Sequence, residues 1–245
     1  MKTQKKALLL IGSPRGENST SASLGNYLIS NLEKSGMQCE KNFIHRLVNR
    51  PEKIQELFTM VNKSDLVIIA FPLYVDSLPA PVIKMMELLK SERDRIKPDK
   101  PQDFIAISNC GFPEAKQIRI ALEICHVFAD EAGFTWKGGI AFGAGEAVHG
   151  MPLEQRGGMV RHVREGLDMA AEALMQGKEV PQEAIDLISK KLMPVAMYKS
   201  MGNLGWRLRA RKFGASKRLK DTLLSSKGLP SFFLFTIPNK KIKWN

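Results

Sequence analysis

A buried-strand pattern runs into a polar loop in the stretch Leu8-Leu-Leu-Ile-Gly-Ser-Pro-Arg-Gly-Glu-Asn-Ser-Thr-Ser21. The apolar run that ends at Ile11 is typical of a parallel strand covered on both faces. The polar cluster after it opens a helix whose apolar positions are Leu24, Leu28 and Leu32. Because free N–H groups and the positive end of the helix dipole point into such a loop, this stretch predicts an anion site. An ordinary strand–turn–helix with a capping Ser/Thr run is the alternative.

The polar groups of this loop favour a terminal phosphate ester. Arg15 offers a fixed cationic fork, Asn18 offers an amide, and hydroxyl donors come from Ser13, Ser19, Thr20 and Ser21. The loop lacks both the G-K-[ST] ending of a P-loop and the G-x-G-x-x-G spacing of a dinucleotide site. A monophosphate ester such as that of FMN fits the remaining pattern.

The rest of the chain alternates apolar strands with helices. Further strands are expected over residues 37–44, 66–71, 103–108 and 135–142, and helices over residues 51–61, 81–90, 114–132, 153–175 and 181–192. Continuous apolar strands separated by helices predict an α/β fold with a parallel sheet covered on both faces. Five strands in this order predict a flavodoxin-like doubly wound sheet, 2-1-3-4-5, with its ligand at the carboxyl ends of the strands.

Three chemically unusual loops follow the first, third and fourth strands. They are Gly12-Ser-Pro-Arg15 with Asn18-Ser-Thr20, Pro72-Leu-Tyr-Val-Asp-Ser-Leu-Pro79, and Asn109-Cys-Gly-Phe112. In the predicted topology all three reach the same edge of the sheet. Over residues 4–175 this pattern resembles the NADPH-dependent FMN reductase family, closest to the branch related to iron–sulfur flavoproteins. That branch carries a compact cysteine cluster between its first two loops, where this chain has only Cys39, so we expect no cluster.

The resemblance implies an FMN site built by these three loops. The first loop would hold the phosphate, the second would line the ribityl chain and ring, and the third would complete the isoalloxazine pocket. The implied residues are Ser13, Arg15, Asn18, Ser19 and Thr20, then Pro72, Leu73, Tyr74, Val75 and Asp76, then Asn109, Gly111 and Phe112. Packing roles for Tyr74 and Phe112, and a helix N-terminal role for Asp76, are the structural alternatives. No catalytic side chain is implied, because the flavin carries the chemistry.

The cysteines and histidines show no metal-ligand spacing. Cys39, Cys110 and Cys125 contain no C-x-x-C pair, so we expect neither a disulfide framework nor a metal site, and we expect a cytoplasmic location. The Cys110 thiol lies near a predicted helix N-terminus, but a small buried residue is the favoured interpretation. His149, in the loop after the fifth strand, is a weaker candidate for contact with substrate.

The net charge of +12 is placed almost entirely at the end of the chain. Residues 1–180 hold 23 Lys and Arg against 22 Asp and Glu, whereas residues 181–245 hold 14 against 3. We therefore expect an FMN-binding domain over residues 1–178 and a basic, aromatic-containing extension, largely helical, over residues 179–245. No segment approaches the roughly 20 apolar residues of a membrane span.

The extension combines basic and apolar residues. Met197, Met201, Leu204 and Leu208 fall at helical spacing with the arginines off that stripe, a pattern that suits an anionic membrane surface or a protein partner through residues 197–245. Packing on the body or across a dimer is the favoured alternative, and nucleic acid the least favoured. The run over residues 232–235 is too apolar to stay exposed, so we expect it to be buried.

The function expected from these features is an NAD(P)H-dependent FMN oxidoreductase. It would pass electrons from NADPH or NADH through bound FMN to a second small acceptor, and it would form a homo-oligomer such as a dimer. The first alternative is a flavodoxin-type electron shuttle with a protein partner. The second is a module recruited to a membrane or nucleic acid through the basic extension. Shuttles tend to be small and acidic, whereas this chain is long and basic, which favours the enzyme.

Overall fold

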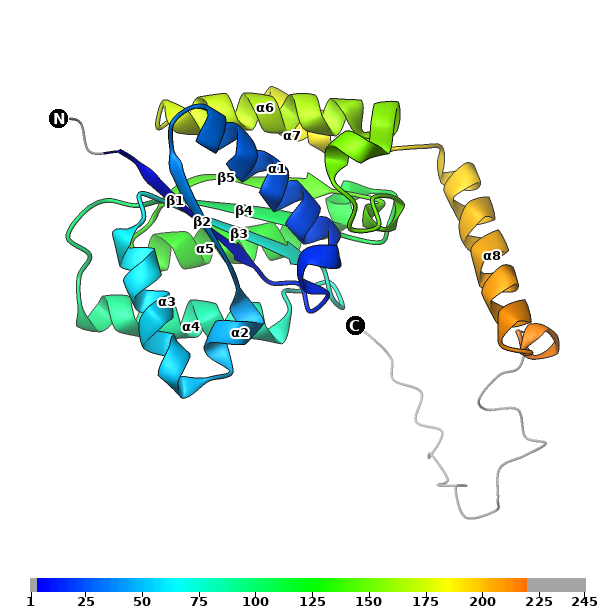
Figure 1. The fold of residues 1–245 in the computed structure, drawn as a ribbon, viewed down its shortest axis with the longest axis horizontal. Helices are drawn as coiled ribbons and strands as arrows, with labels where there is room; N and C mark the ends of the chain where they lie inside the picture. Colours follow the sequence, from blue (N-terminus) through cyan, green and yellow to red (C-terminus); the bar gives the residue numbers. More distant parts are fainter. Residues whose placement is uncertain (1–3, 220–245) are drawn as a thin grey trace, which may run out of the picture. The chain divides into compact units, whose positions relative to one another are not determined.

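The computed structural model describes residues 4–219 of the 245-residue chain. The chain divides into two compact units, residues 1–194 and residues 195–245, and each is described by itself. In the first unit, five parallel strands form one sheet in the order β2-β1-β3-β4-β5 (Figure 1). The strands are β1 (Lys6–Ile11), β2 (Gln38–Phe43), β3 (Leu66–Pro72), β4 (Asp103–Asn109) and β5 (Thr135–Phe142). This order confirms the predicted flavodoxin-like doubly wound sheet.

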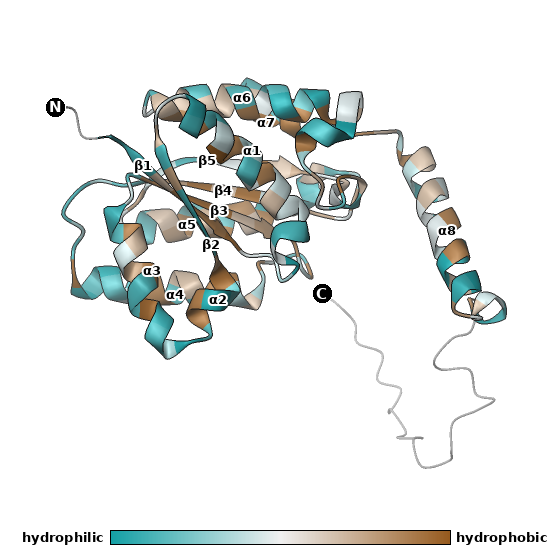
Figure 2. Ribbon diagram, viewed as in Figure 1, coloured by the Kyte–Doolittle hydropathy of each residue, from teal (hydrophilic) through white to brown (hydrophobic). Residues whose placement is uncertain are grey.

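Helices cover both faces of the sheet. One face carries α1 (Thr20–Lys34), α6 (Arg161–Met175) and α7 (Gln182–Ser189), and the other carries α2 (Ile44–Val48), α3 (Pro51–Lys63), α4 (Ala80–Arg95) and α5 (Arg119–Glu131). Leu9 and Ile11 of β1 pack on the α1 side, while Leu8 and Leu10 pack on the α4 side. Because both faces are covered, successive residues of the central strands are apolar, as the brown strands of Figure 2 show.

Two predicted helices differ in their first turns. The helix expected over residues 114–132 starts as a 3-10 turn, Ala115–Ile118, before α5 begins. The helix expected over residues 153–175 starts with 3-10 turns at Leu153–Val160, inside which Gly157 has φ 60° and ψ −143°. An α-helix cannot pass through that backbone geometry, so α6 begins only at Arg161. The short helix α2 was not expected from the sequence.

The carboxyl ends of the strands hold the loops that matter for function. Main-chain hydrogen bonds extend the ladder past the strands, from Gly12 N–H to the Ala70 oxygen at 2.8 Å and from Cys110 N–H to the Phe142 oxygen at 3.1 Å. A Cβ on Gly12 would lie 2.4 Å from Val82 Cγ2 of α4, so only glycine lets the first loop pass this closely. The loops are therefore fixed by the strands that deliver them.

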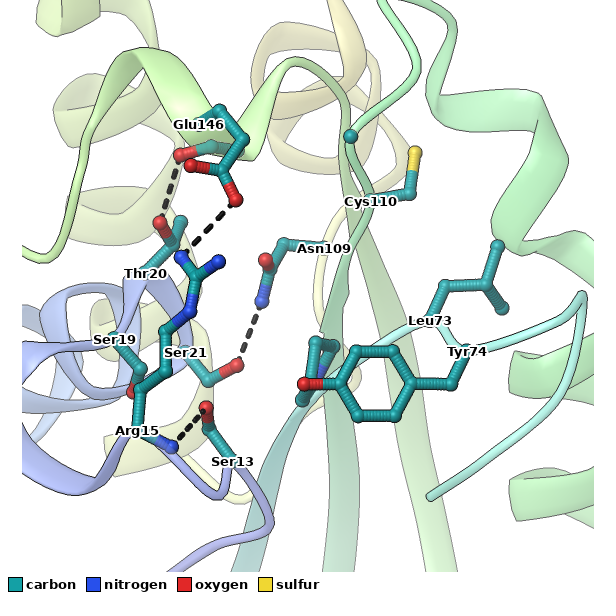
Figure 3. A pocket seen from close by; sticks show the side chains of 13 residues that line it. Ser13, Arg15, Ser19, Thr20, Ser21, Leu73, Tyr74, Asn109, Cys110 and Glu146 are labelled. Carbon is teal, nitrogen blue, oxygen red and sulfur yellow. Dashed lines mark hydrogen bonds and ion pairs between the residues drawn. The ribbon is translucent and has the colours of Figure 1, made fainter. Parts of the chain in front are cut away.

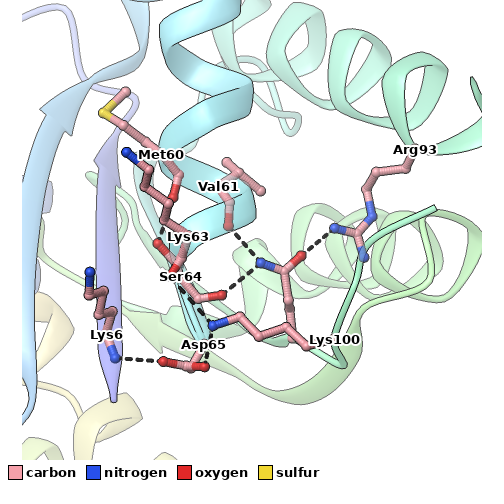
Figure 4. A network of polar contacts seen from close by, with 9 residues as sticks. Lys6, Met60, Val61, Lys63, Ser64, Asp65, Arg93 and Lys100 are labelled. Atoms are coloured by element: carbon pink, nitrogen blue, oxygen red, sulfur yellow. Dashed lines mark hydrogen bonds and ion pairs between the residues drawn. The ribbon is translucent and has the colours of Figure 1, made fainter. Parts of the chain in front are cut away.

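The amino end of the sheet is tied by a polar network (Figure 4). Buried Arg93 of α4 donates to the Gln102 Oε1 atom at 2.5 Å, and the Gln102 amide donates to the carbonyls of Val61 and Ser64 at 2.6 and 2.7 Å. The Arg93 guanidinium also lies 3.7 Å from the centre of the Phe134 ring. These contacts join α3, α4 and the segment before β4 at the end of the sheet away from the three loops.

Asp65 completes the same network. Its carboxylate accepts a hydrogen bond from the Lys6 N–H at 2.7 Å and lies 2.5 Å from Lys100 Nζ. Burial raises the pKa of Asp65, but the Lys100 and Lys6 hydrogen bonds outweigh it, so the net pKa lies below the ordinary value of 3.8. The carboxylate therefore stabilises the start of β1 in its charged form.

The second unit contains α8 (Val195–Lys212) and a 3-10 turn, Ser216–Arg218. Helix α7 belongs to the first unit, where it packs on α6 and β5. The domain division expected after residue 178 stays a prediction, and the apolar run over residues 232–235 lies outside the described residues. Among the helices described between residues 4 and 219, none has the length and apolar character needed to cross a membrane.

Candidate cofactor-binding site

A cleft opens where the loops after β1, β3, β4 and β5 meet (Figure 3). Its lining residues come from positions far apart in the sequence: Ser13, Arg15, Ser19, Thr20, Ser21, Pro72, Leu73, Tyr74, Asn109, Cys110, Gly111, Gly145 and Glu146. The first loop supplies hydroxyls and a guanidinium, and the second supplies apolar and aromatic surface. The third loop and the loop after β5 complete the lining, and Gly145 and Glu146 of the latter contact Thr20 and Arg15 of the first.

The N-terminus of α1 forms one wall of this cleft. Ser19 is the N-cap residue, and its hydroxyl oxygen accepts from the Ala22 N–H at 3.1 Å while its O–H donates to the Gly16 carbonyl at 2.6 Å. The N–H groups of Thr20 and Ser21 have no partner within a helix that starts here, and nothing in residues 4–219 accepts from them. Two N–H donors at the positive end of a 15-residue helix make this wall suited to an anion.

Arg15, the arginine that lines the cleft, forms an ion pair with Glu146. Arg15 Nη1 lies 3.0 Å from Glu146 Oε1, and the two side chains are 59% and 54% exposed. Glu146 also lies 3.7 Å from the Nδ1 atom of His149. Figure 3 shows the Arg15 side chain pointing towards Glu146. The buried Ser13 hydroxyl accepts from the Arg15 N–H at 3.3 Å. The anion wall is thus bordered by an acidic group that competes for its only lining arginine.

Hydrogen bonds lock the loops to one another. Asn109 Nδ2 donates to the Ser21 hydroxyl at 2.7 Å and to the Phe71 carbonyl at 3.3 Å, which joins β4 to α1 and β3. The Thr20 hydroxyl donates to the Gly145 carbonyl at 2.7 Å, which joins α1 to the loop after β5. These three polar residues are buried, so the frame of the cleft is rigid before any ligand arrives.

A tight turn aims Tyr74 at the cleft. Tyr74 and Ser77 exchange main-chain hydrogen bonds of 2.9 and 3.0 Å, and between them Val75 and Asp76 have φ values of 49° and 55°. Successive left-handed residues are the geometry of a type I′ turn, and a β-branched valine rarely adopts it. The turn points the ring of Tyr74 into the cleft (Figure 3) and leaves Val75 99% exposed. Strain of this kind is typical of loops that serve a site.

Most of the residues expected to bind FMN meet in this cleft. Those that line it are Ser13, Arg15, Ser19, Thr20, Pro72, Leu73, Tyr74, Asn109 and Gly111. Asn18, Val75, Asp76 and Phe112 do not line it, and Phe112 is 52% exposed. Their contact with a cofactor stays a prediction.

Sequence reasoning missed Gly145 and Glu146 as lining residues and did not carry Ser21 and Cys110 into the expected site. The same edge rule that selected the first three loops applies to the loop after β5, which follows the fifth strand to the same place. Burial raises the pKa of the Cys110 thiol, so it is not an activated nucleophile. Among the described residues no group of His, Cys, Asp and Glu gathers to hold a metal ion.

The donor set fits FMN. Free helix N–H groups, buried hydroxyls and one arginine suit the terminal phosphate, while Leu73 and Tyr74 give a flat apolar wall next to it. The cleft lies at the switch point of a doubly wound sheet, and it combines a wall suited to an anion with an aromatic wall. This combination is typical of the flavodoxin-like flavin proteins.

A family model described as NADPH-dependent FMN reductase matches residues 5–136, more than half of the chain. The chain belongs to this family and is an oxidoreductase that uses FMN and NADPH. This confirms the family resemblance, the enzyme class and the cofactors expected from the sequence. A search of curated protein sequences found no match.

Solved structures share the fold at low identity. The NAD(P)H:quinone oxidoreductase from Methanothermobacter marburgensis is 13% identical, with a TM-score of 0.52 over 70% of this chain and 96% of that one. An FMN-dependent NADH-azoreductase from Bacillus anthracis str. Ames Ancestor, in complex with FMN, is 9% identical, with a TM-score of 0.50 over 70% and 99%. At these identities the likeness shows the fold alone.

Proposed function

We propose that this cleft holds FMN, with the phosphate at the N-terminus of α1 and the ring system beside Tyr74. The observation that carries the proposal is the meeting of the unpaired Thr20 and Ser21 N–H groups with an aromatic wall in one rigid cleft. The phosphate would accept from these N–H groups and from the Ser13 hydroxyl. Asn109 positions the anion wall through its hydrogen bond to Ser21.

The chain contributes binding and orientation to the reaction. Bound FMN supplies hydride acceptance and electron release, the chemistry that no side chain in the cleft offers. Leu73 and Tyr74 exclude water from one side of the ring position, and the main chain at Gly111 approaches without a side chain in the way. No acid or base is assigned, because transfer between a nicotinamide and a flavin needs alignment rather than a protein proton donor.

The second substrate is proposed to be a small electron acceptor that enters beside Tyr74. The Tyr74 side chain is 44% exposed, so the edge of the cleft it borders is open to solvent. The two solved structures that share the fold are named as a quinone oxidoreductase and an azoreductase, so a quinone and an azo dye are the first acceptors to test. NADPH and NADH are compared with each acceptor.

The first measurement is the visible spectrum of the purified protein, followed by mass spectrometry of the released cofactor. We expect about one FMN per chain, either in the protein as purified or after FMN is added to a colourless preparation. Arg15→Ala should weaken FMN binding and leave the fold intact. Arg161→Ala removes another exposed, ion-paired arginine, on α6, and should leave FMN binding unchanged. Equal affinities in the two variants would refute the phosphate assignment.

Stopped-flow reduction distinguishes the enzyme from an electron shuttle. Rapid bleaching of the bound flavin by NADPH, followed by reoxidation with a small acceptor, is expected for the proposed function. A flavin that NADPH leaves oxidised, but that exchanges electrons with a reduced protein partner, would favour the shuttle instead. The basic charge of the chain argues against the shuttle, because shuttles of this fold tend to be acidic.

We also propose a homo-oligomer in the cytoplasm. Ile120, Ile124 and Val127 form an apolar stripe on α5 that is 50%, 40% and 60% exposed, which suits a contact between copies of the chain. All three cysteines are free thiols, as a reducing compartment favours. Light scattering on the eluting protein gives the oligomeric state, and Ile124→Asp should lower it.

A further inference from the structure

Helix α8 exposes an apolar stripe to solvent. Met197, Met201, Leu204 and Leu208 recur at the spacing i, i+4, i+7 and i+11, and these side chains are 47%, 58%, 58% and 59% exposed. At 3.6 residues per turn they fall within an arc of about 60° on one side of the helix. Figure 2 shows hydrophobic positions, in brown, between hydrophilic ones along α8. Four large apolar side chains aligned in water are an unsatisfied surface.

Cations border the stripe on both flanks. By the same helical geometry, Arg207 and Arg211 fall on one side of it, and Arg209 and Lys212 on the other. Trp206 falls about 180° away, on the opposite side of the helix. Between residues 195 and 219 the chain has seven Lys and Arg and no Asp or Glu. One side of α8 therefore carries the apolar stripe with cations on both flanks, while the opposite side carries Trp206.

This arrangement selects among the surfaces that α8 could bind. A second copy of α8 is disfavoured, because two such segments repel each other and neither offers an acidic partner. Nucleic acid would satisfy the charge but not the apolar stripe, since phosphate contacts need only Lys and Arg. A layer of anionic lipid satisfies both, because it places negative headgroups directly above an apolar phase.

The helix also needs a stabilising surface. Gly202 and Gly205 lie inside α8, and glycine is the poorest helix former after proline. Within the second unit, Ala210 is the only buried residue of α8. Most helices in proteins are stabilised by burying an apolar face. The interface of a lipid layer would bury this one.

We propose that α8 binds the surface of anionic lipid membranes, with the stripe of Met197, Met201, Leu204 and Leu208 in the headgroup–acyl boundary and the flanking cations at the headgroups. The helix lies on the membrane rather than across it, because it is too polar for a span. The consequence for the enzyme is recruitment to a membrane surface, where apolar electron acceptors concentrate.

The test is co-sedimentation of the full-length protein with vesicles. One set is phosphatidylcholine alone, and the other contains about one third phosphatidylglycerol, an anionic lipid. We expect binding to the anionic vesicles only, and weaker binding when salt is raised from about 0.1 M to about 0.5 M. Leu204→Ser/Leu208→Ser should reduce vesicle binding on the order of tenfold or more, because two apolar side chains leave the interface.

The matched control lies on the same helix. Trp206→Ser/Phe213→Ser removes one exposed aromatic side chain from the opposite face of α8 and one from the residue directly after the helix, so vesicle binding should stay within about twofold of the unaltered protein. Arg207→Gln/Arg211→Gln should weaken anionic binding while keeping the stripe. Bound FMN reports whether the first unit of each variant is folded, and circular dichroism reports whether helix content, including that of α8, is kept.

Four outcomes would overturn the proposal. Equal binding to neutral and anionic vesicles would show that charge does not drive the binding. An equal loss of vesicle binding in Leu204→Ser/Leu208→Ser and Trp206→Ser/Phe213→Ser would show that the stripe is not the binding surface. Binding to duplex DNA or RNA that survives Leu204→Ser/Leu208→Ser, with no vesicle binding in the unaltered protein, would make the surface a nucleic-acid contact. Absence of any vesicle binding also refutes the inference.

Discussion

Glu146→Gln should tighten FMN binding, although it removes a charged residue from the cleft. In the structure Glu146 Oε1 lies 3.0 Å from Arg15 Nη1, so the carboxylate occupies the guanidinium that a phosphate would use. It also places a negative charge on the lining of a cleft proposed to receive a phosphate dianion. Glutamine keeps the size and an oxygen acceptor but removes the charge, so it separates competition from packing.

The expected gain is small, because the ion pair is exposed. Both side chains are more than half exposed, and pairs of this kind contribute about 0.2–1 kcal/mol. At 1.4 kcal/mol per factor of ten, loss of this competitor corresponds to an affinity increase of up to about fivefold. The gain should shrink as salt is raised, because exposed charges are screened.

Flavin fluorescence on titration into the apoprotein measures the dissociation constant. Riboflavin is the control ligand, since it has the same ring and ribityl chain but no phosphate, and Glu146→Gln should leave its affinity unchanged. In the Arg15→Ala background the effect of Glu146→Gln should also fall, because no guanidinium remains to be released. Weaker FMN binding in Glu146→Gln, or equal tightening of FMN and riboflavin, would refute the reasoning.

Three further predictions concern the scaffold. Arg93→Leu should lower the free energy of unfolding by about 3 kcal/mol in urea denaturation, because Gln102 Oε1 and two main-chain carbonyls lose a buried charged donor; a loss below about 0.5 kcal/mol would contradict the network role. Asp65→Asn should lower the free energy of unfolding by less than about 1 kcal/mol at neutral pH, and should not change it well below pH 3.8. The pKa of the Asp65 carboxyl is lower in the folded than in the unfolded protein, so its stabilising effect is present above the unfolded pKa and is lost as the pH falls. The Cys110 and Cys125 thiols should react slowly with iodoacetamide at pH 8 until the protein is denatured, since burial raises the pKa of each; rapid labelling of the folded protein would contradict this.

The sheet was predictable because its strands carry an unambiguous signal. A strand covered on both faces must be apolar at nearly every position, so β3, expected over residues 66–71 and observed at Leu66–Pro72, could be placed to within one residue from the sequence alone. Strand order then followed from the alternation of strands with helices. The helix starts were less predictable, because the apolar spacing of residues 153–175 continues through Gly157, whose backbone geometry no helix can accommodate.

The sequence predicts the chemical character of the cleft, but not the turn and the ion pair that shape it. Hydroxyls and an arginine after a buried strand indicate an anion site wherever they occur. The position of Val75 could not be deduced, because a left-handed valine runs against local preference and only the closed turn between Tyr74 and Ser77 imposes it. Pairing across 131 residues, as between Arg15 and Glu146, is likewise decided by the tertiary structure.

The main-chain donors of the cleft and its exposed, ion-paired Arg15 should affect FMN binding in different ways. The Thr20 and Ser21 N–H groups are fixed by α1, and Asn109 donates to the Ser21 hydroxyl. In the proposed site they would select a phosphate by geometry and respond only weakly to salt. Arg15 is shared with Glu146 at the surface, so its contribution depends on ionic strength and on the competing carboxylate. Selectivity for FMN over riboflavin should therefore persist at high salt, while the rate of FMN release rises. We therefore propose that FMN bound in this cleft exchanges with solvent, and that the Arg15–Glu146 pair sets the rate of that exchange.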